Sequence, residues 1–397
     1  MGKKIITGIA LSLWGALLVI LLWAGIYNYV LPSEISIAGE ETLPDFPCVS
    51  LCERAVYADA FSDVSVMDAK LFGVVSLKKI EVKDYSNLKL IPSGQTFGVR
   101  LYGDGVCVVG TAEVTSGGKS VSPAARAGLA PRDLILSVND TPVKSVTDLK
   151  TAIENAKGAP VRIRYRRAGE EKNTVLTPIL DDGDGKYKTG MWVKDSATGI
   201  GTVSYIHPET GEFGALGHGV CDGETGTLLP LSRGVVTDAV VTDVIKGTKG
   251  KPGELKGYLK AEKTGALTQN TECGVFGVIA NAPKQEAIPV APASAVKTGK
   301  ATLRTMLDGD VPVDYEIEII EVHAKSPNKS FTVKVTDSRL LAKTGGIVQG
   351  MSGSPIIQNG KLIGAVTHVM IGDPTSGYGI FIENMLAAAE MPMAKAS

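Results

Sequence analysis

Cysteine and histidine are scarce in this sequence, and neither sign of charge is in excess. Five cysteines in 397 residues are too few for a disulfide-built scaffold, and their odd number leaves at least one thiol unpaired or paired between chains. The four histidines are scattered and no His-Glu-x-x-His occurs, so we expect no metal or cofactor and no zinc metallopeptidase. Lys and Arg number 41 against 42 for Asp and Glu, which argues against a nucleic-acid-binding protein.

The composition favours a folded chain that is mainly β. Hydrophobic residues make up 44% and charged residues 21%, which excludes wholesale disorder. The chain contains 46 glycines, which suit tight turns and bulges better than helix interiors. Its length leaves room for two or three domains.

The N-terminus carries the one long hydrophobic run. Lys3 and Lys4 precede an uncharged stretch over residues 5–33, long enough to cross a bilayer as a helix. The two lysines predict a cytoplasmic N-terminus, with the bulk of the chain across the membrane. We expect residues 1–33 to form a cytoplasmic tip and a transmembrane signal anchor. A cleavable signal peptide is the alternative, although its apolar region is usually shorter and ends at a small-residue site.

Further segments follow from local patterns. Residues 34–90 read as a stalk with short strands, in which Cys48 and Cys52 are close enough for a small disulfide loop. A module over 91–180 contains a strand at 134–138, a helical stretch at 146–156 and a second strand, and the acidic, Gly-rich run at 181–186 ends it as a linker. From residue 187 to 397, short β-like runs broken by Gly and Pro predict a barrel or sandwich with a helix near its end.

A serine between glycines provides the sharpest chemical signal. In Gly-Met-Ser-Gly-Ser-Pro the glycines allow a tight exposed turn around Ser352, and the amides of Gly350 and Ser352 could then form an oxyanion hole. Asn359-Gly360 between apolar runs predicts a type I′ hairpin directly after this turn. A strand–turn–helix nucleophile elbow is therefore excluded, and a Gly/Ser turn without chemistry is the competing interpretation.

A serine nucleophile needs a base, and His218 in Gly-Ala-Leu-Gly-His-Gly is the best candidate among the histidines. A carboxylate must hold the imidazole in the correct tautomer. Spacing leaves four candidates for it open: Asp222, Asp238, Asp243 and Asp337.

The end of the chain resembles the C-terminal barrel of chymotrypsin-like serine peptidases, on the strength of GMSGSP, LIGAVTHV and SGYGIFIE. This resemblance implies a double β-barrel peptidase domain. It also implies that one strand pairs with the substrate backbone and that a second borders the specificity pocket. The residues concerned are Thr367, His368 and Val369 on the first, and Gly377, Tyr378 and Gly379 on the second.

More closely, nearly the whole chain resembles the sporulation stage IV B peptidase family. The shared features are the N-terminal anchor, LFGVVSLKKIEV, the PDZ-like module, GALGH, TDSRLL, GMSGSP and AVTHVMIGDPTSGYG. In that family the matching residues form a catalytic triad, which implies His218, Asp337 and Ser352 here.

The module at 91–180 resembles a bacterial PDZ domain, through SPAARAGLAPRDLILSVND and an apolar–Gly–apolar segment. We expect Phe97, Gly98 and Val99 to cap the carboxylate of a bound peptide tail, which would add as a strand beside them. A purely structural module is the alternative.

The family resemblance implies a membrane-anchored or secreted signalling protease of sporulation. Its substrate would be the membrane-bound regulator of an intramembrane metalloprotease, so that cleavage triggers sigma factor activation. It would act in the forespore intermembrane space and cleave itself within residues 34–70. Two alternatives differ in class. One is an HtrA-like quality-control protease, in which the peptidase would precede the PDZ domain. The other is a PDZ adaptor with a dead peptidase domain.

Overall fold

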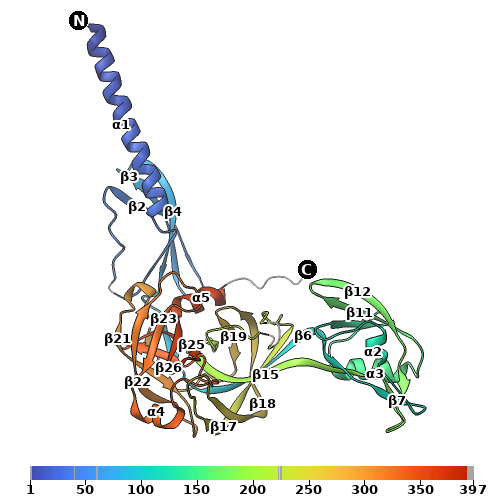
Figure 1. Cartoon of the computed structure of the whole chain (residues 1–397). Coiled ribbons are helices and arrows are strands. Elements are labelled where there is room, and N and C mark those ends of the chain that lie inside the picture. The colour runs from blue at the N-terminus through green and yellow to red at the C-terminus, as the bar shows by residue number, and fades with distance from the viewer. Residues whose placement is uncertain (1, 40, 60, 222, 224–225, 391–397) are drawn as a thin grey trace.

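The computed structural model of the chain describes residues 2–39, 41–59, 61–221, 223 and 226–390. A long N-terminal helix projects from a small sheet, the sheet adjoins a pair of β-barrels, and a further lobe extends sideways from one barrel (Figure 1). The chain is mainly β, which confirms the predicted fold class.

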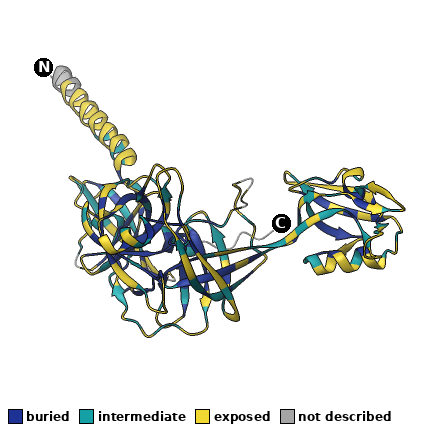
Figure 2. Cartoon of the chain, turned by 60° about the horizontal axis from the view of Figure 1, so that its bottom comes forward, coloured by how far each residue is buried: buried dark blue, intermediate teal, exposed yellow. Residues whose placement is uncertain are grey.

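The N-terminal helix α1 (Gly2–Val30) contains the predicted hydrophobic run. Its segment Gly8–Val30 has a mean hydropathy of 2.4, and its side chains are exposed rather than packed on the rest of the protein (Figure 2). At about 1.5 Å per residue such a segment matches the roughly 30 Å hydrocarbon core of a bilayer. By length and composition α1 can cross a membrane, and an N-terminal signal sequence has the same properties.

The region predicted as a stalk is a folded sheet. Its order is β1-β4-β3-β2, with β1 parallel to β4 and the other neighbours antiparallel. Leu31, Ile35 and Ile80 are in its small core. Cys48 and Cys52 are free, exposed thiols in this structure. The strands are β1 (Glu34–Ile37), β2 (Val49–Ala58), β3 (Asp63–Leu71) and β4 (Val75–Asp84).

The first barrel begins before the PDZ-like lobe and ends after it. Its pairings run from β6 through β17, β18, β19, β16 and β15 and return to β6. Phe97, Phe213 and Leu216 are in the buried core of this ring. The strands of this region are β5 (Lys89–Pro92), β6 (Thr96–Thr111), β15 (Met191–Ile206), β16 (Glu212–Ala215), β17 (Arg233–Ile245), β18 (Glu254–Thr271), β19 (Gly274–Ile279) and β20 (Ile288–Pro289).

The PDZ-like lobe is therefore an insertion between β6 and β15, which are both long enough to belong to the barrel and the lobe. The predicted boundary at residue 91 is corrected accordingly, because β5 and the first half of β6 pair with barrel strands. The predicted strand at 134–138 and helix near 146–156 are confirmed. The lobe contains β7 (Val114–Ser116), β8 (Lys119–Val121), α2 (Pro123–Arg126), β9 (Leu134–Val138), β10 (Thr141–Pro142), α3 (Val146–Asn155), β11 (Val161–Arg167), β12 (Glu170–Leu176), β13 (Ile179–Leu180) and β14 (Tyr187–Lys188).

The second barrel is closed in the order β21-β22-β23-β26-β25-β24 around a large apolar core. Asn359 and Gly360 both have positive φ and join β24 to β25, which confirms the predicted hairpin. The predicted C-terminal helix is present up to Glu390, and its remainder lies outside the described residues. The elements are η1 (Ala293–Ala295), β21 (Gly299–Thr305), β22 (Val313–Val322), β23 (Phe331–Val335), α4 (Ser338–Thr344), β24 (Pro355–Gln358), β25 (Lys361–Met370), β26 (Asp373–Phe381) and α5 (Ile382–Glu390).

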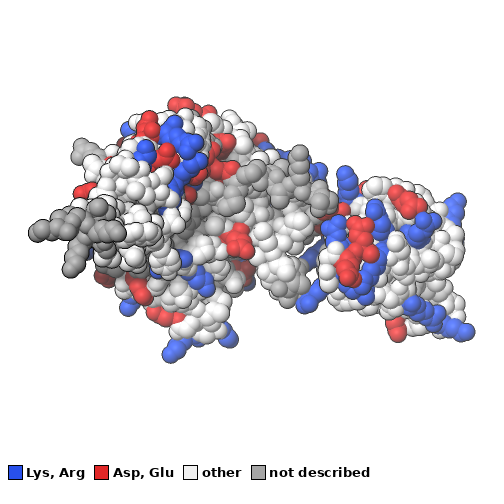
Figure 3. Space-filling view, turned by 90° about the horizontal axis from the view of Figure 1, so that it is seen from above, with Lys and Arg blue, Asp and Glu red and all other residues white. Residues whose placement is uncertain are grey.

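Charges of both signs are interspersed on the face of the molecule seen in Figure 3, without a broad area of one sign. This distribution agrees with the near-zero net charge of the sequence.

Candidate active site

The Ser352 turn connects α4 to β24 and lies where the two barrels meet. Gly350 and Gly353 have φ of 98° and 95°, a region that favours glycine. A Cβ at Gly353 would lie 1.9 Å from the carbonyl oxygen of Thr202 on β15, so the turn is pressed against the first barrel. The Ser352 hydroxyl donates a 2.7 Å hydrogen bond to the carbonyl oxygen of Thr367 on β25.

His218 follows β16 and reaches the same strand from the first barrel. Leu216 and Gly217 both have φ of 68°, which turns the chain sharply after β16. A Cβ at Gly217 would lie 2.9 Å from the Thr367 methyl carbon, and the His218 ring stands 4.8 Å from the ring of His368. The structure thus brings Ser352 and His218 to adjacent residues of β25, Thr367 and His368.

A backbone carbonyl orients the His218 ring. Nδ1 lies 2.9 Å from the carbonyl oxygen of Gly219, which can only accept, so Nδ1 carries the proton and Nε2 is left as a base. Burial lowers the pKa of His218 below its usual value. Burial lowers the pKa of His368 to about 4, with smaller contributions from His218 and Lys329. Both rings are therefore neutral at pH 7, and His218 can accept a proton.

The two amides proposed for an oxyanion hole are available. Neither Gly350 N–H nor Ser352 N–H donates a hydrogen bond within the part of the chain that the structure describes. Met351 N–H and Gly353 N–H, by contrast, bond to the carbonyls of Val348 and Val366. The donors at 350 and 352 are thus left for a ligand.

In the structure Asp337 bonds to α4 and β22 and not to His218, so the arrangement differs from the predicted triad. Asp337 is the N-cap of α4, and its carboxylate accepts hydrogen bonds from the amides of Arg339, Leu340 and Glu316. Its Oδ2 also lies 2.7 Å from a guanidinium nitrogen of Arg339. The Arg339 guanidinium, helped by those amides, holds the pKa of this carboxyl far below its usual range. Both carboxylate oxygens of Asp337 therefore accept hydrogen bonds from residues of α4 or β22.

None of the other candidate carboxylates is seen to hydrogen-bond to the His218 ring within the described residues. Asp238 pairs with Lys260 at 3.5 Å, and Asp243 accepts from the amide of Val244. Asp222 lies outside the described residues. Among the residues that the structure does describe, no carboxylate bonds to His218, and the Gly219 carbonyl occupies the place beside Nδ1.

The predicted substrate strand has an open edge beside Ser352. Beyond Val366, β25 pairs only with β26 in the described chain, so no strand covers the other edge of Thr367, His368 and Val369. Gly377, Tyr378 and Gly379 lie on β26, directly opposite. They pair with β25 on one side and with β23 on the other, so β26 is a central strand without a free edge at these residues.

Phe97, Gly98 and Val99 do not form a peptide carboxylate loop, and that prediction is wrong. Their backbones pair with Gly201, Ile200 and Gly199 of β15 on one side and with Asp238, Thr237 and Val236 of β17 on the other. Phe97 and Val99 are 3% exposed in the barrel core. No amide there faces a peptide.

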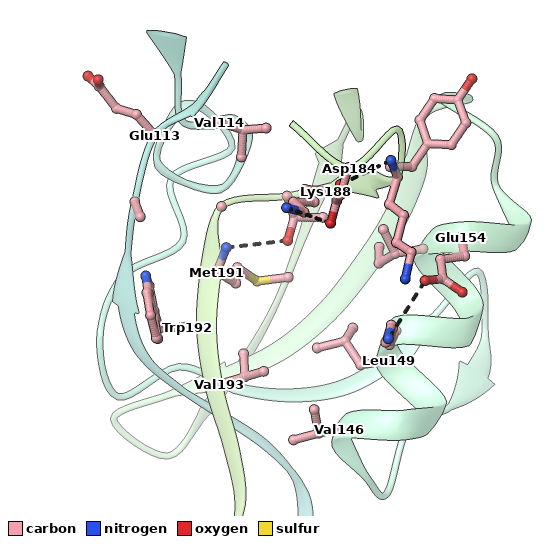
Figure 4. A pocket seen from close by; sticks show the side chains of 17 residues that line it. Glu113, Val114, Val146, Leu149, Glu154, Asp184, Lys188, Met191, Trp192 and Val193 are labelled. Atoms are coloured by element: carbon pink, nitrogen blue, oxygen red, sulfur yellow. Dashed lines mark hydrogen bonds and ion pairs between the residues drawn. The ribbon is translucent and has the colours of Figure 1, made fainter. Parts of the chain in front are cut away.

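The groove of the lobe lies instead between α3 and the start of β15 (Figure 4). It encloses about 460 Å³ between Leu149 and Ile153 on the helix and the segment 189–193 opposite. Gly190 has a φ of 73°, and a Cβ there would lie 2.3 Å from the carbonyl of Ala112, so only glycine fits this bend. From Met191 to Val193, β15 forms a ladder only with β6 within the described residues, so no strand pairs with its edge toward α3.

The sequence analysis did not identify this groove, and it did not identify Thr202 as part of the candidate active site. The run Thr-Gly-Met-Trp-Val at 189–193 has the glycine-then-apolar pattern sought at 97–99, and it precedes a strand, so the signal was present. Thr202 hydrogen-bonds to the Ser352 turn across 150 residues of sequence, and no local pattern points to it.

Two protein-family models match parts of the chain. A model of the PDZ domain matches residues 115–167, and the model described as SpoIVB peptidase S55 matches residues 185–386, more than half of the chain. Among solved structures, the PDZ domain of an SdrC-like protein from Listeria monocytogenes is similar, with 23% identity over 23% of this chain and 87% of that one, at a TM-score of 0.19. The chain therefore belongs to the SpoIVB peptidase S55 family and is a serine peptidase, a hydrolase of peptide bonds.

Proposed function

We propose that Ser352 is the nucleophile of this peptidase and His218 its general base. The observation that carries the proposal is the convergence of the Ser352 hydroxyl and the His218 ring on Thr367–His368 from two separate barrels. Asp337 is not assigned to the reaction, and the Gly219 carbonyl holds the imidazole tautomer.

The chemistry follows from these positions. Ser352 Oγ attacks the substrate carbonyl carbon while His218 Nε2 takes the hydroxyl proton. The amides of Gly350 and Ser352 stabilise the negative charge that develops on the carbonyl oxygen. His218 then returns its proton to the leaving amine, and water, deprotonated by the same ring, hydrolyses the acyl-enzyme.

In the resting structure the Ser352 hydroxyl bonds to Thr367 rather than to His218. The Thr367 carbonyl belongs to the open edge of β25, where a substrate strand would donate its own N–H. A substrate that pairs with Thr367 would displace the hydroxyl and free it to turn toward His218. Substrate binding and nucleophile activation then become one event.

The role of the peptidase is signalling during sporulation. The chain is anchored by α1 with its bulk outside the cytoplasm, in the forespore intermembrane space. There it cleaves the regulator of an intramembrane metalloprotease and so triggers sigma factor activation. Support comes from the family match together with one apolar helix long enough to span a membrane. A quality-control protease is disfavoured because the lobe is inserted into the first barrel and does not follow the peptidase domain.

Self-cleavage near the N-terminus tests this role directly. When the full chain is incubated in detergent and followed by intact mass spectrometry, we expect loss of the N-terminal segment by a cut within residues 34–70. The Ser352→Ala form, made in the same way, should remain uncut. A product of equal yield from both proteins would assign the cut to another protease.

The groove beside α3 is proposed as the site that binds a peptide tail. The edge of β15 that no strand covers offers main-chain hydrogen bonds to a peptide, and the bend at Gly190 marks the end of the groove at which we expect the terminal carboxylate. Leu149 and Ile153 supply an apolar wall for the last side chain. We therefore expect ligands with a free carboxylate and an apolar terminal residue.

An arginine placed inside the groove should remove this binding. Val146 is half-buried on the groove face of α3, and Val146→Arg is expected to weaken binding at least about tenfold by filling the space. Thr147→Arg is the matched control, because Thr147 is exposed and does not line the groove. Binding of a peptide pool with free or amidated C-termini can be followed by fluorescence of Trp192, which is 67% exposed at the groove. Equal binding by both variants would place the peptide elsewhere.

A further inference from the structure

The backbone of the Ser352 turn is held at each of four successive carbonyls. Gln349 C=O accepts from Leu255 N–H at 2.8 Å, and Met351 C=O accepts from Ser354 N–H at 2.9 Å. Ser352 C=O accepts from Thr202 N–H at 2.9 Å. These three donors are backbone amides. The fourth carbonyl, that of Gly350, accepts a 2.9 Å hydrogen bond from the side chain of Thr202.

Thr202 is placed for this task by the first barrel. It lies on β15, is 0% exposed, and its backbone pairs with Thr96 of β6. Its carbonyl oxygen accepts from Leu216 N–H, two residues before His218, and is the atom that a Cβ at Gly353 would strike. One residue therefore contacts the segments that carry both the base and the nucleophile.

Gly350 is the residue of the turn at which the backbone can rotate most easily. It joins the peptide plane that carries the first oxyanion donor to the plane whose carbonyl Thr202 holds. As a glycine at a φ of 98°, it has no side chain to limit rotation of either plane. Without the Thr202 hydroxyl, the peptide plane between Gly350 and Met351 is held within the described residues only at its N–H, which donates to the Val348 carbonyl. An oxyanion hole is effective only when its donors are fixed before the charge develops.

We propose that Thr202 is a positioning residue of the peptidase, whose hydroxyl fixes the peptide plane between Gly350 and Met351, and so holds in place the two neighbouring planes that carry the oxyanion donors. The inference rests on the proposed roles of Ser352 and His218. Thr202 is buried beneath the turn and acts through Gly350. Its loss should therefore slow the chemical step and leave ligand binding nearly unchanged.

The test uses the full chain in detergent and a rhodamine-tagged fluorophosphonate. In this reaction Ser352 Oγ forms a bond to phosphorus, fluoride leaves, and the hydroxyl proton passes to His218. The phosphoryl oxygen takes the place of the oxyanion. The rate of labelling at saturation and the probe concentration at half-saturation are measured separately for wild type, Thr202→Val and Thr202→Ser. Val keeps the shape and the backbone amide but lacks the hydroxyl, and Ser restores the hydroxyl.

Thr305→Val is the matched control. Thr305 is also 0% exposed on a barrel strand, β21, and its hydroxyl has no hydrogen-bond partner within the described structure. We expect Thr202→Val to lower the saturated rate about 10–100-fold, with the half-saturating concentration changed less than about threefold. Thr202→Ser should return the rate to within about threefold of wild type, and Thr305→Val should label like wild type.

The outcomes separate the two proposals. If Thr202→Val labels within twofold of wild type while Ser352→Ala does not label, the positioning role is wrong and the nucleophile stands. Equal loss in Thr202→Val and Thr305→Val, with matching loss of thermal stability, would reduce Thr202 to a packing residue. Labelling of Ser352→Ala at the wild-type rate would overturn the assignment of the nucleophile, and the role of Thr202 with it.

Discussion

Ser352→Ala is expected to lower the rate of peptide-bond cleavage by at least about 10⁴-fold, to the level left by binding and an empty oxyanion hole. The variant should fold as the wild type does. The Ser352 hydroxyl makes one hydrogen bond, to the Thr367 carbonyl, and the turn itself is held by backbone groups and by Thr202. Cleavage is measured on a synthetic peptide that spans the mapped self-cleavage site.

The same turn supplies a matched control in Ser354. This side chain is 0% exposed, and its hydroxyl has no partner among the described residues, while its amide supports the turn whatever the side chain. Ser354→Ala should retain cleavage within about twofold of wild type. Cleavage by Ser352→Ala at more than a few percent of the wild-type rate, or loss of activity in Ser354→Ala alone, would place the nucleophile elsewhere.

The segments that carry the proposed nucleophile and base could be identified from the sequence because local backbone chemistry marks both of them. Gly350 and Gly353 surround Ser352, Gly217 and Gly219 surround His218, and positive φ values at 217, 350 and 353 show why glycine is needed. The hairpin after Ser352 was predictable for the same reason, since Asn-Gly encodes its turn. The sequence indicates such turns directly, without knowledge of what packs against them.

What could not be predicted is decided by pairing between distant strands. Phe97-Gly98-Val99 has an apolar–Gly–apolar pattern, but β15 and β17 take up both edges of that strand. The insertion of the PDZ lobe into a barrel depends on β6 meeting β15 about 95 residues later. In the same way Asp337 has suitable spacing from Ser352, and only the structure shows that Arg339 and the first turn of α4 hold its carboxylate.

Asp337→Ala is expected to destabilise the second barrel by about 2–3 kcal/mol at pH 7. It removes the N-cap of α4, which contributes about 1 kcal/mol, and leaves the part-buried Glu316 amide short of an acceptor. The ion pair with Arg339 adds less, because that guanidinium side chain is 63% exposed. The difference in unfolding free energy is measured by urea denaturation followed at the aromatic residues.

The destabilisation should depend on pH in a defined direction. Because the folded pKa of Asp337 is depressed, its contribution is complete above the unfolded pKa of about 4 and is lost as the pH falls below it. Wild type and Asp337→Ala should therefore approach each other in stability between about pH 4 and pH 2.5. Asp308→Ala, which removes an exposed ion pair to Lys343 on the same helix, should change stability by less than about 0.5 kcal/mol at either pH.

Activity decides whether Asp337 has any role beyond α4. The helix leads through Gly345 into the Ser352 turn, so Asp337→Ala should also lower cleavage, by about tenfold at a temperature where the variant is folded. A folded Asp337→Ala protein whose rate falls about 10⁴-fold, as in a triad that has lost its carboxylate, would contradict this account. It would mean that the carboxylate leaves Arg339 and turns to His218 when substrate is bound.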